Sequence, residues 1–157
     1  MSLEVERKFL VKNDGWRGLA PGVRYRQGYL NVEPERTVRV RIAAASAFLT
    51  IKGRNVDGAA PEYEYLIPLT DAGHMLDTMA KRPLIEKIRY AITYSSRIWE
   101  VDEFLGENAG LVLAEVELDR VGQSVALPDW IGEEVTGDPR YYNTSLMKHP
   151  FDTWRNR

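Results

Sequence analysis

The sequence predicts a mainly β, α+β fold: an antiparallel β-barrel of roughly eight strands with flanking helices. Most of the chain alternates apolar and charged residues with a period of two, which is typical of strands. Turn-forming runs such as Asn13-Asp14-Gly15, Asn31–Pro34 and Asn55–Ala60 separate these segments. At 157 residues, the chain is expected to form a single domain. We expect the sheet to close, because closure removes its unpaired edges.

The alternating segments are assigned as strands, and each is bounded by a turn signal or by a break in the pattern. In chain order, they are Leu3–Val11, Val23–Val32, Arg36–Ala44, Ala47–Arg54, Glu62–Pro68, Leu84–Thr93, Arg97–Phe104 and Gly110–Leu118. Each strand is expected to place its apolar residues on one face and its charged residues on the other.

One segment, Leu69–Lys81, departs from this alternation and is predicted to be a helix. Thr70 or Asp71 can cap its N terminus, and Pro83 ends it. Its buried stripe is expected to comprise Ala72, Leu76, Met79 and Ala80.

A second helix is expected after Asn143, with Leu146 and Met147 facing inward. The predicted single domain therefore covers residues 1–157, with a C-terminal helix or tail at about 143–157. No motif indicates a role for the segment after Leu146.

Composition narrows the classes of function. A net charge of −2 predicts no attraction to nucleic acid or to an anionic membrane. The absence of cysteine excludes disulfides and thiolate metal sites, and two histidines, His74 and His149, are too few for a zinc site. A metal would need carboxylate ligands, which favours Mg²⁺, Mn²⁺ or Ca²⁺. With no apolar run of spanning length and no signal-peptide pattern, a cytoplasmic location is expected.

Charges recur at i and i+2 on most of the predicted strands. In Arg36–Ala44, for example, Arg39 and Arg41 share one face, while Val38 and Val40 occupy the other. The charged faces elsewhere hold Glu4, Glu6 and Lys8; Lys52; Glu62 and Glu64; Lys87 and Arg89; Glu100 and Asp102; and Glu115 and Glu117.

This pattern fits two arrangements. The apolar faces could form the core and leave the charged faces in solvent, as amphipathic strands usually do. Alternatively, the charged faces could point into a wide barrel whose apolar exterior is partly covered by helices or loops. Arginine and glutamate occur as doublets, and Tyr63, Tyr90 and Trp99 lie on the uncharged faces, which favours the second arrangement. The alternation alone does not decide between them.

An interior lined with basic side chains would need a polyanionic ligand, because each buried unpaired charge costs several kcal/mol. Arginine binds phosphate oxygens bidentately and lysine binds them as a point charge, so a chain of phosphates is suited to such a site. Facing carboxylates would repel that chain unless divalent cations lay between them. The second arrangement therefore predicts a site for a metal and a polyphosphate.

The order of these charged motifs resembles that of the CYTH superfamily, also called the triphosphate tunnel metalloenzymes. The segment from Glu4 to Lys8 resembles its ExExK signature, which is a weak pattern by itself. Further motifs in family order are Gln27-Gly28-Tyr29-Leu30, Arg39-x-Arg41, Lys52, Glu62-x-Glu64, Glu86-Lys87-x-Arg89, Val101-Asp102-x-Phe104, Leu113-Ala114-Glu115-x-Glu117, Gly132-x-Glu134-Val135-Thr136 and Tyr141-x-Asn143. The resemblance implies an eight-stranded antiparallel tunnel with its charges inside.

The resemblance also implies a role for each matching residue. Triphosphate binding is expected of Lys8, Arg39, Arg41, Lys52, Lys87 and Arg89, and Arg26 is expected either to add a phosphate contact or to form a structural salt bridge. Metal ligation is expected of Glu4, Glu6, Asp102, Glu115 and Glu117. The catalytic residues are expected to be Glu62, Glu64 and Lys8, with one of the two glutamates accepting the proton of the attacking water.

The short chain is similar to the bacterial branch of the family that hydrolyses inorganic triphosphate with Mg²⁺ or Mn²⁺. An adenylate cyclase of the CYTH type, a thiamine-triphosphatase and a non-catalytic polyphosphate-binding module are the alternatives. The paired carboxylates argue against the binding module, since binding alone would be better served by more cations. A triphosphate is therefore the expected partner, nucleic acid and membrane are not, and a homodimer is left open.

Overall fold

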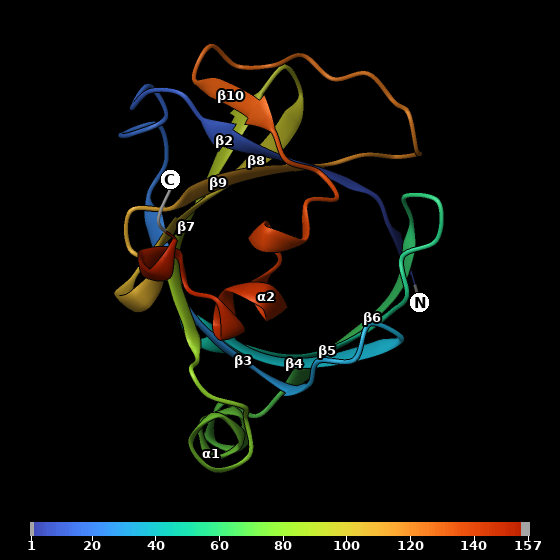
Figure 1. The fold of residues 1–157 in the computed structure, drawn as a ribbon, viewed down its shortest axis with the longest axis vertical. Coiled ribbons are helices and arrows are strands. Elements are labelled where there is room, and N and C mark those ends of the chain that lie inside the picture. Colours follow the sequence, from blue (N-terminus) through green and yellow to red (C-terminus); the bar gives the residue numbers. More distant parts are fainter. Residues whose placement is uncertain (1, 155–157) are drawn as a thin grey trace.

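The computed structural model describes residues 2–154, which form ten strands, two α-helices and three short 3₁₀ helices (Figure 1). The strands are β1 (Ser2–Glu4), β2 (Glu6–Val11), β3 (Gly22–Asn31), β4 (Arg36–Ala43), β5 (Ser46–Gly53), β6 (Ala60–Ile67), β7 (Ile85–Tyr94), β8 (Arg97–Phe104), β9 (Val112–Glu117) and β10 (Ile131–Glu134). The helices are α1 (Leu69–Thr78), η1 (Gly106–Asn108), η2 (Pro139–Tyr141), α2 (Asn143–Lys148) and η3 (Phe151–Thr153). The mainly β prediction is confirmed, and each predicted strand has a counterpart. The C-terminal end of the predicted domain, residues 155–157, lies outside the described residues.

The ten strands make one antiparallel sheet in the order β1-β6-β5-β4-β3-β7-β8-β9-β2-β10. The sheet curls around on itself, as Figure 1 shows. The two ends of the strand order are joined by one continuous stretch of chain. In it, β1 pairs with β6 near one end, β2 pairs with β9 near the other, and only Val5 separates β1 from β2. No strand pairing joins β1 to β10 at the ends of this order. The predicted closed barrel of eight strands is therefore corrected to a curled sheet of ten.

Two features account for this difference. The predicted first strand is interrupted at Val5, whose side chain is buried in the outer apolar cluster with Phe9 and Trp99. The strand β10 is short and was not predicted. It pairs with β2 through Ile131 and Glu134 with an irregular register, so it carries too few alternating residues to be detected.

The helix α1 lies outside the curled sheet, against β4 and β5 (Figure 1). Its buried residues Ala72 and Leu76 pack on Val40, as the predicted stripe requires. Gly28 on β3 lets the helix and the residues after it approach the sheet closely, since a Cβ there would lie 3.1 Å from Leu76 Cδ2 and 2.8 Å from Ala80 Cβ. The predicted end at Lys81 was too late. Met79, predicted to be buried, is 65% exposed because the helix ends before it.

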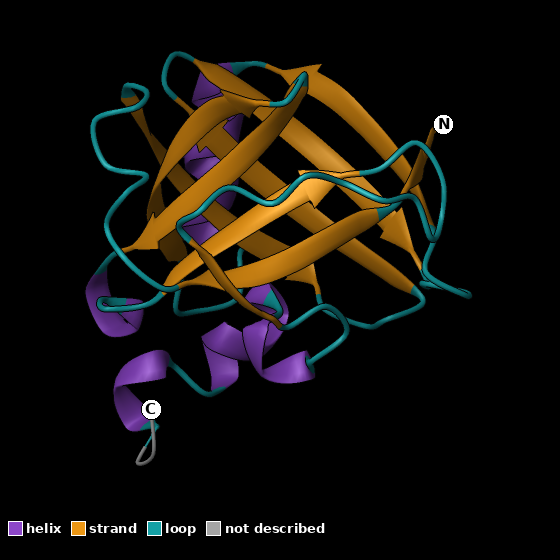
Figure 2. Ribbon diagram, turned by 90° about the horizontal axis from the view of Figure 1, so that it is seen from above, coloured by secondary structure: helices purple, strands orange, loops and turns teal. Residues whose placement is uncertain are grey.

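The helix α2 lies within the outline of the curled sheet in Figure 1 and beyond the ends of its strands in Figure 2. It therefore covers one end of the sheet. The predicted inward residues of this helix, Leu146 and Met147, are buried in a cluster with Tyr29, Phe104 and Tyr141, and Phe151 and Trp154 pack against that cluster. The segment without a recognisable motif thus helps to close this end.

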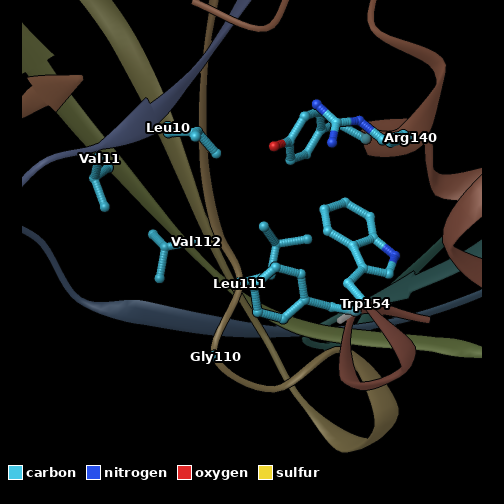
Figure 3. A pocket seen from close by; sticks show the side chains of 9 residues that line it. Leu10, Val11, Gly110, Leu111, Val112, Arg140 and Trp154 are labelled. Carbon is cyan, nitrogen blue, oxygen red and sulfur yellow. The ribbon is translucent and has the colours of Figure 1, made fainter. Parts of the chain in front are cut away.

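A pocket of about 230 Å³ lies beside the same cluster (Figure 3). Its walls are mainly apolar, and Arg140 is the one charged residue that lines it among residues 2–154, with its guanidinium 2.8 Å from Asp138. A triphosphate needs several cations, so this pocket does not fit the predicted chemistry.

The helices of residues 2–154 are all too short or too polar to span a membrane.

Candidate active site

The side of the sheet that faces inward is fixed by Val40. This residue of β4 is fully buried against α1, which lies outside, so its neighbours Arg39 and Arg41 point to the inner side. Strand pairing extends the inner face around the sheet. It carries the basic residues Lys8, Arg39, Arg41, Lys52, Lys87 and Arg89, and the acidic residues Glu4, Glu6, Glu62, Glu64, Glu100, Asp102, Glu115 and Glu117.

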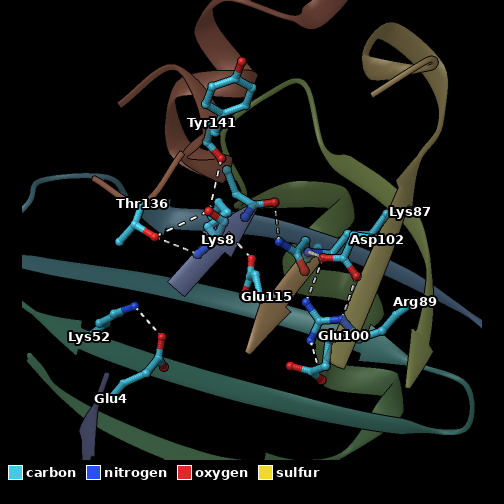
Figure 4. Close-up of polar contacts among 12 residues, drawn as sticks. Glu4, Lys8, Lys52, Lys87, Arg89, Glu100, Asp102, Glu115, Thr136 and Tyr141 are labelled. Carbon is cyan, nitrogen blue, oxygen red and sulfur yellow. Dashed lines mark hydrogen bonds and ion pairs between the residues drawn. The ribbon is translucent and has the colours of Figure 1, made fainter. Parts of the chain in front are cut away.

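The deepest charges form a buried triad from β7 and β8 (Figure 4). Arg89 donates from Nε to Asp102 Oδ1 at 2.7 Å and from Nη2 to Asp102 Oδ2 at 2.8 Å. Lys87 Nζ lies 2.7 Å from the same Oδ2, and the Lys87 side chain is 1% exposed. Glu100 Oε2 accepts a further bond from Arg89 at 3.1 Å.

Burial sets the charge state of Lys87. Burial lowers the pKa of Lys87, and the nearby charges of Arg89 and Arg41 add to this effect, while the attraction of Asp102 opposes it; the net result is a pKa of about 7. Burial alone would raise the pKa of Asp102, but the charges of Lys87 and Arg89 outweigh it and hold that pKa low.

Lys8 connects β2 to the segment that covers the end of the sheet (Figure 4). Its Nζ lies 3.6 Å from Glu115 Oε1 and donates to the Tyr141 carbonyl at 3.3 Å. Its main-chain N–H donates to Thr136 Oγ1 at 2.9 Å. Strand pairing therefore places Lys8 opposite Glu115, and the C-terminal segment holds it from the other side.

Arg39 and Arg41 of β4 have fewer charged partners. Arg41 Nε donates to the amide of Gln27 at 2.8 Å, and burial lowers the pKa of Arg41 to about 10, with Arg39 and Arg89 adding to this effect. Arg39 Nη2 donates to Thr50 Oγ1 at 3.1 Å and to Glu64 Oε2 at 3.4 Å. The buried Nε of Arg39 finds no hydrogen-bond partner among the described residues. Both guanidiniums thus retain unused capacity to bind an anion.

The carboxylates gather on β1, β2, β6 and β9. Glu4 Oε1 accepts from Lys52 Nζ at 2.7 Å, and the carboxyl of Glu62 also bonds Glu4. Although burial alone would raise the pKa of Glu4, Glu62 and Lys52 lower it to about 2, while the bond to Glu4 raises the pKa of Glu62 to about 8. Glu6 is crowded as well: burial and the charges of Glu115 and Glu4 raise its pKa well above the usual value.

This crowding indicates which residues would hold a cation. Side chains that repel one another as carboxylates are stabilised by a divalent ion, and their oxygens are the donors that Mg²⁺ and Mn²⁺ prefer. The set Glu4, Glu6, Glu115 and Glu117 fits this chemistry, since Glu6 pairs across the strands with Glu117. In residues 2–154, no three such side chains already converge into a coordination site.

Two predicted site residues differ from the others in their contacts. Arg26 lies on the outer side of β3, where its Nη2 donates to Asp77 of α1 at 2.9 Å, so the structural salt bridge is the alternative that holds. Asp102 is on the inner side, but both of its oxygens bind Arg89 and one also meets Lys87. These contacts hold the two cations in place, and the metal ligation expected of Asp102 stays a prediction.

The predicted set also omitted inner-face residues. The acid group of Glu100 binds Arg89, the amide of Gln27 joins Arg41 to Asn143 of α2, and the hydroxyl of Thr50 donates to Glu64 at 2.7 Å. The register of the paired strands could have identified Thr50, since it lies between Arg39 and Glu64. For Gln27, the only signal in the sequence is its place in the motif Gln27-Gly28-Tyr29-Leu30, which implies no role for it.

Known proteins resemble this chain in sequence and in fold. The chain is 46% identical over 155 residues to an inorganic triphosphatase of Acetivibrio thermocellus, covering 99% of each chain. An inorganic triphosphatase of Nitrosomonas europaea is 36% identical over 149 residues, covering 91% of this chain and 95% of that protein. The crystal structure of an inorganic triphosphatase superimposes with a TM-score of 0.65 at 35% identity, over 91% of this chain and 96% of that chain.

A more distant structure, a conserved hypothetical protein of Pyrococcus furiosus, shares the fold with a TM-score of 0.58 at 18% identity, over 76% of this chain and 80% of that chain. The model of the CYTH domain matches residues 2–149, which is nearly the whole of the described chain. This match, together with the close relatives, shows that the chain belongs to the CYTH domain family.

Proposed function

We propose that the protein hydrolyses inorganic triphosphate on the inner face of the curled sheet, with the help of a divalent cation. The observation that carries this proposal is the pairing of Arg39 and Arg41, which retain free anion-binding capacity, with a crowded carboxylate group on the facing strands. The close relative from Acetivibrio thermocellus, an inorganic triphosphatase, supports it across nearly the full chain.

Substrate binding would fall to the basic residues. Phosphoryl transfer depends mainly on positioning the phosphates and neutralising their charge, so a ring of fixed cations is the main requirement. Arg39 and Arg41 would hold phosphate oxygens with their unused N–H groups, and Lys8 would contact them from β2. Lys52, Lys87 and Arg89 would complete the ring, held in place by Glu4 and Asp102.

Glu4, Glu6, Glu115 and Glu117 are the residues that would hold Mg²⁺ or Mn²⁺. A metal ion bound there would neutralise phosphate charge and make water more acidic. These glutamates form ion pairs or crowd one another in the structure, so cation binding would relieve the repulsion that raises the pKa of Glu6. The identity of the metal as Mg²⁺ or Mn²⁺ stays a prediction.

Glu62 and Glu64 remain the proposed acceptors for the proton of the attacking water. Glu64 is held by Thr50 and Arg39, and its side chain is 40% exposed, so water can reach it. Glu62 shares its proton with Glu4 and must lose it before it can act as a base. Lys8 is the proposed contact to the phosphoryl group that is transferred.

The proposal is tested by measuring phosphate release from tripolyphosphate with Mg²⁺, with Mn²⁺ and with a chelator. Release with either metal and none with the chelator is expected. Tight binding of tripolyphosphate without release would instead favour the non-catalytic binding module. The cytoplasmic location, the homodimer and the single domain of residues 1–157 stay predictions.

A further inference from the structure

Tyr25 lies between two of the proposed substrate-binding arginines. It belongs to β3, and its Cα partners are Ala43 on β4 and Lys87 on β7. Its side chain shares the inner face with Gln27, because Arg26 between them points outward to α1. The guanidinium carbons of Arg41 and Arg89 each lie 4.9 Å from the centre of its ring. One aromatic ring thus touches a cation from each neighbouring strand.

The two arginines differ in what else holds them. Arg89 is fixed by both oxygens of Asp102 and by Glu100. Arg41 has no carboxylate partner among the described residues; its Nε binds the neutral amide of Gln27. The positive charges of Arg39 and Arg89 also act on Arg41. Its position therefore depends on Gln27 and on the face of Tyr25, since an aromatic ring attracts a guanidinium.

We infer that Tyr25 is a positioning residue that holds Arg41 beside Arg89, so that both guanidiniums meet the same polyphosphate. This inference rests on the proposed function and extends it to a residue outside the predicted site. Without the ring, repulsion between the two cations would turn Arg41, the one without a carboxylate, away from the substrate. The hydroxyl of Tyr25 takes no part in this role, because the attraction comes from the ring.

The test compares Tyr25→Leu and Tyr25→Phe with the unchanged chain in steady-state hydrolysis of tripolyphosphate with Mg²⁺. Tyr25→Leu is expected to raise KM by roughly tenfold, as the loss of about 1.4 kcal/mol of attraction would. Tyr25→Phe keeps the ring and is expected to restore KM to within about twofold of the unchanged chain. The kcat of both variants is expected to change less than KM, because the reacting groups remain in place.

A matched control is Tyr65→Leu, the same change at a tyrosine on the outer face of β6 that is 55% exposed. A second readout, the rise in Tm caused by tripolyphosphate in a chelator, separates binding from turnover and should shrink only for Tyr25→Leu. If Tyr25→Leu folds poorly, Tyr25→Thr removes the ring with a residue suited to strands.

Equal KM values for Tyr25→Leu and the unchanged chain would overturn the role of Tyr25 and leave the hydrolysis of triphosphate standing. A tenfold rise in Tyr25→Phe as well would also overturn it, because the ring would then be irrelevant. Failure of the unchanged chain to release phosphate would overturn both this inference and the proposed function.

Discussion

Asp102 and Arg89 face each other across β8 and β7, joined by two nearly parallel hydrogen bonds of 2.7 and 2.8 Å. The carboxylate also neutralises Lys87, so a single buried anion compensates two buried cations. Buried pairs of this kind are costly to break, because the partners left behind are unpaired charges. Asp102 is therefore the residue on which the stability of the inner face most depends.

Asp102→Asn is predicted to destabilise the fold by about 3–5 kcal/mol, which corresponds to a drop in Tm of about 10 °C. Tripolyphosphate should recover part of the loss, because it supplies the missing negative charge. The control is Glu103→Gln, next on β8 but bound to Arg17 at the surface, which should cost no more than about 1 kcal/mol. Thermal unfolding with and without tripolyphosphate measures both. Equal effects of the two variants would refute the proposed burial of the triad.

Arg41→Ala is predicted to weaken the binding of tripolyphosphate by about 10- to 100-fold, since a charged hydrogen bond contributes about 1.5–3 kcal/mol. Arg26→Ala removes the same side chain from the outer side of β3 and should leave KM nearly unchanged. The KM values of the two variants measure this difference. Similar losses in both would mean that the inner and outer faces of β3 and β4 are assigned incorrectly.

Much of this arrangement could be predicted from the sequence, but the alternation left open whether Arg26 contacts phosphate or forms a salt bridge. Charged doublets mark the inner face on β4, β7 and β9, so the same rule would turn Arg24 and Arg26 of β3 inward. On β3, the inner residues are instead Tyr25 and Gln27, which lie among the arginines of β4 and β7. Both faces of this strand are polar, so alternation alone cannot choose between them.

The alternation within one strand also cannot predict which residues of the neighbouring strand lie opposite it. That Asp102 is a charged inner residue followed from the alternation, but its position opposite Arg89 depends on the register of β7 and β8. The two-residue turn at Ser95 and Ser96 fixes this register. Its Ser-Ser sequence differs from the Asn-Gly or Asp-Gly pairs that usually mark such a turn, so the sequence does not reveal it. A carboxylate held by two cations and a carboxylate that binds a metal have the same pattern in the sequence.

That turn gives a prediction about stability. Ser95 and Ser96 have φ values of 47° and 64°, as the two-residue turn between β7 and β8 requires, and this region is unfavourable for serine. Ser96→Gly is predicted to stabilise the fold by about 0.5–1 kcal/mol. Ser46→Gly, in the strand β5, should destabilise it instead. Urea unfolding distinguishes the two, and a loss of stability in Ser96→Gly would show that the turn is not strained.

Glu117→Gln is predicted to raise the metal concentration needed for half-maximal activity, because it removes one of the proposed oxygen ligands beside Glu6. Titration of the activity with Mg²⁺ or Mn²⁺ measures this shift. The control is Glu133→Gln on β10, where the side chain is exposed and is not one of the proposed ligands. An identical titration for Glu117→Gln and the unchanged chain would count against ligation by Glu117.

Tripolyphosphate itself should raise the Tm of the unchanged chain, because it binds only the folded form and relieves the repulsion among Arg39, Arg41 and Arg89. At a concentration of about 100 times Kd, the expected gain is about 2.7 kcal/mol, or roughly 5–10 °C. Monophosphate at the same ionic strength is the control for general charge screening. Equal shifts with the two anions would contradict a site built for several phosphates.

The most direct test of the central claim is phosphate release from tripolyphosphate, ATP and thiamine triphosphate, measured side by side with Mg²⁺ and with Mn²⁺. The inner face offers cations and carboxylates for a chain of phosphates, so the account predicts that kcat/KM is highest for tripolyphosphate. A higher value for ATP or thiamine triphosphate would contradict that claim and favour an enzyme that recognises the organic group.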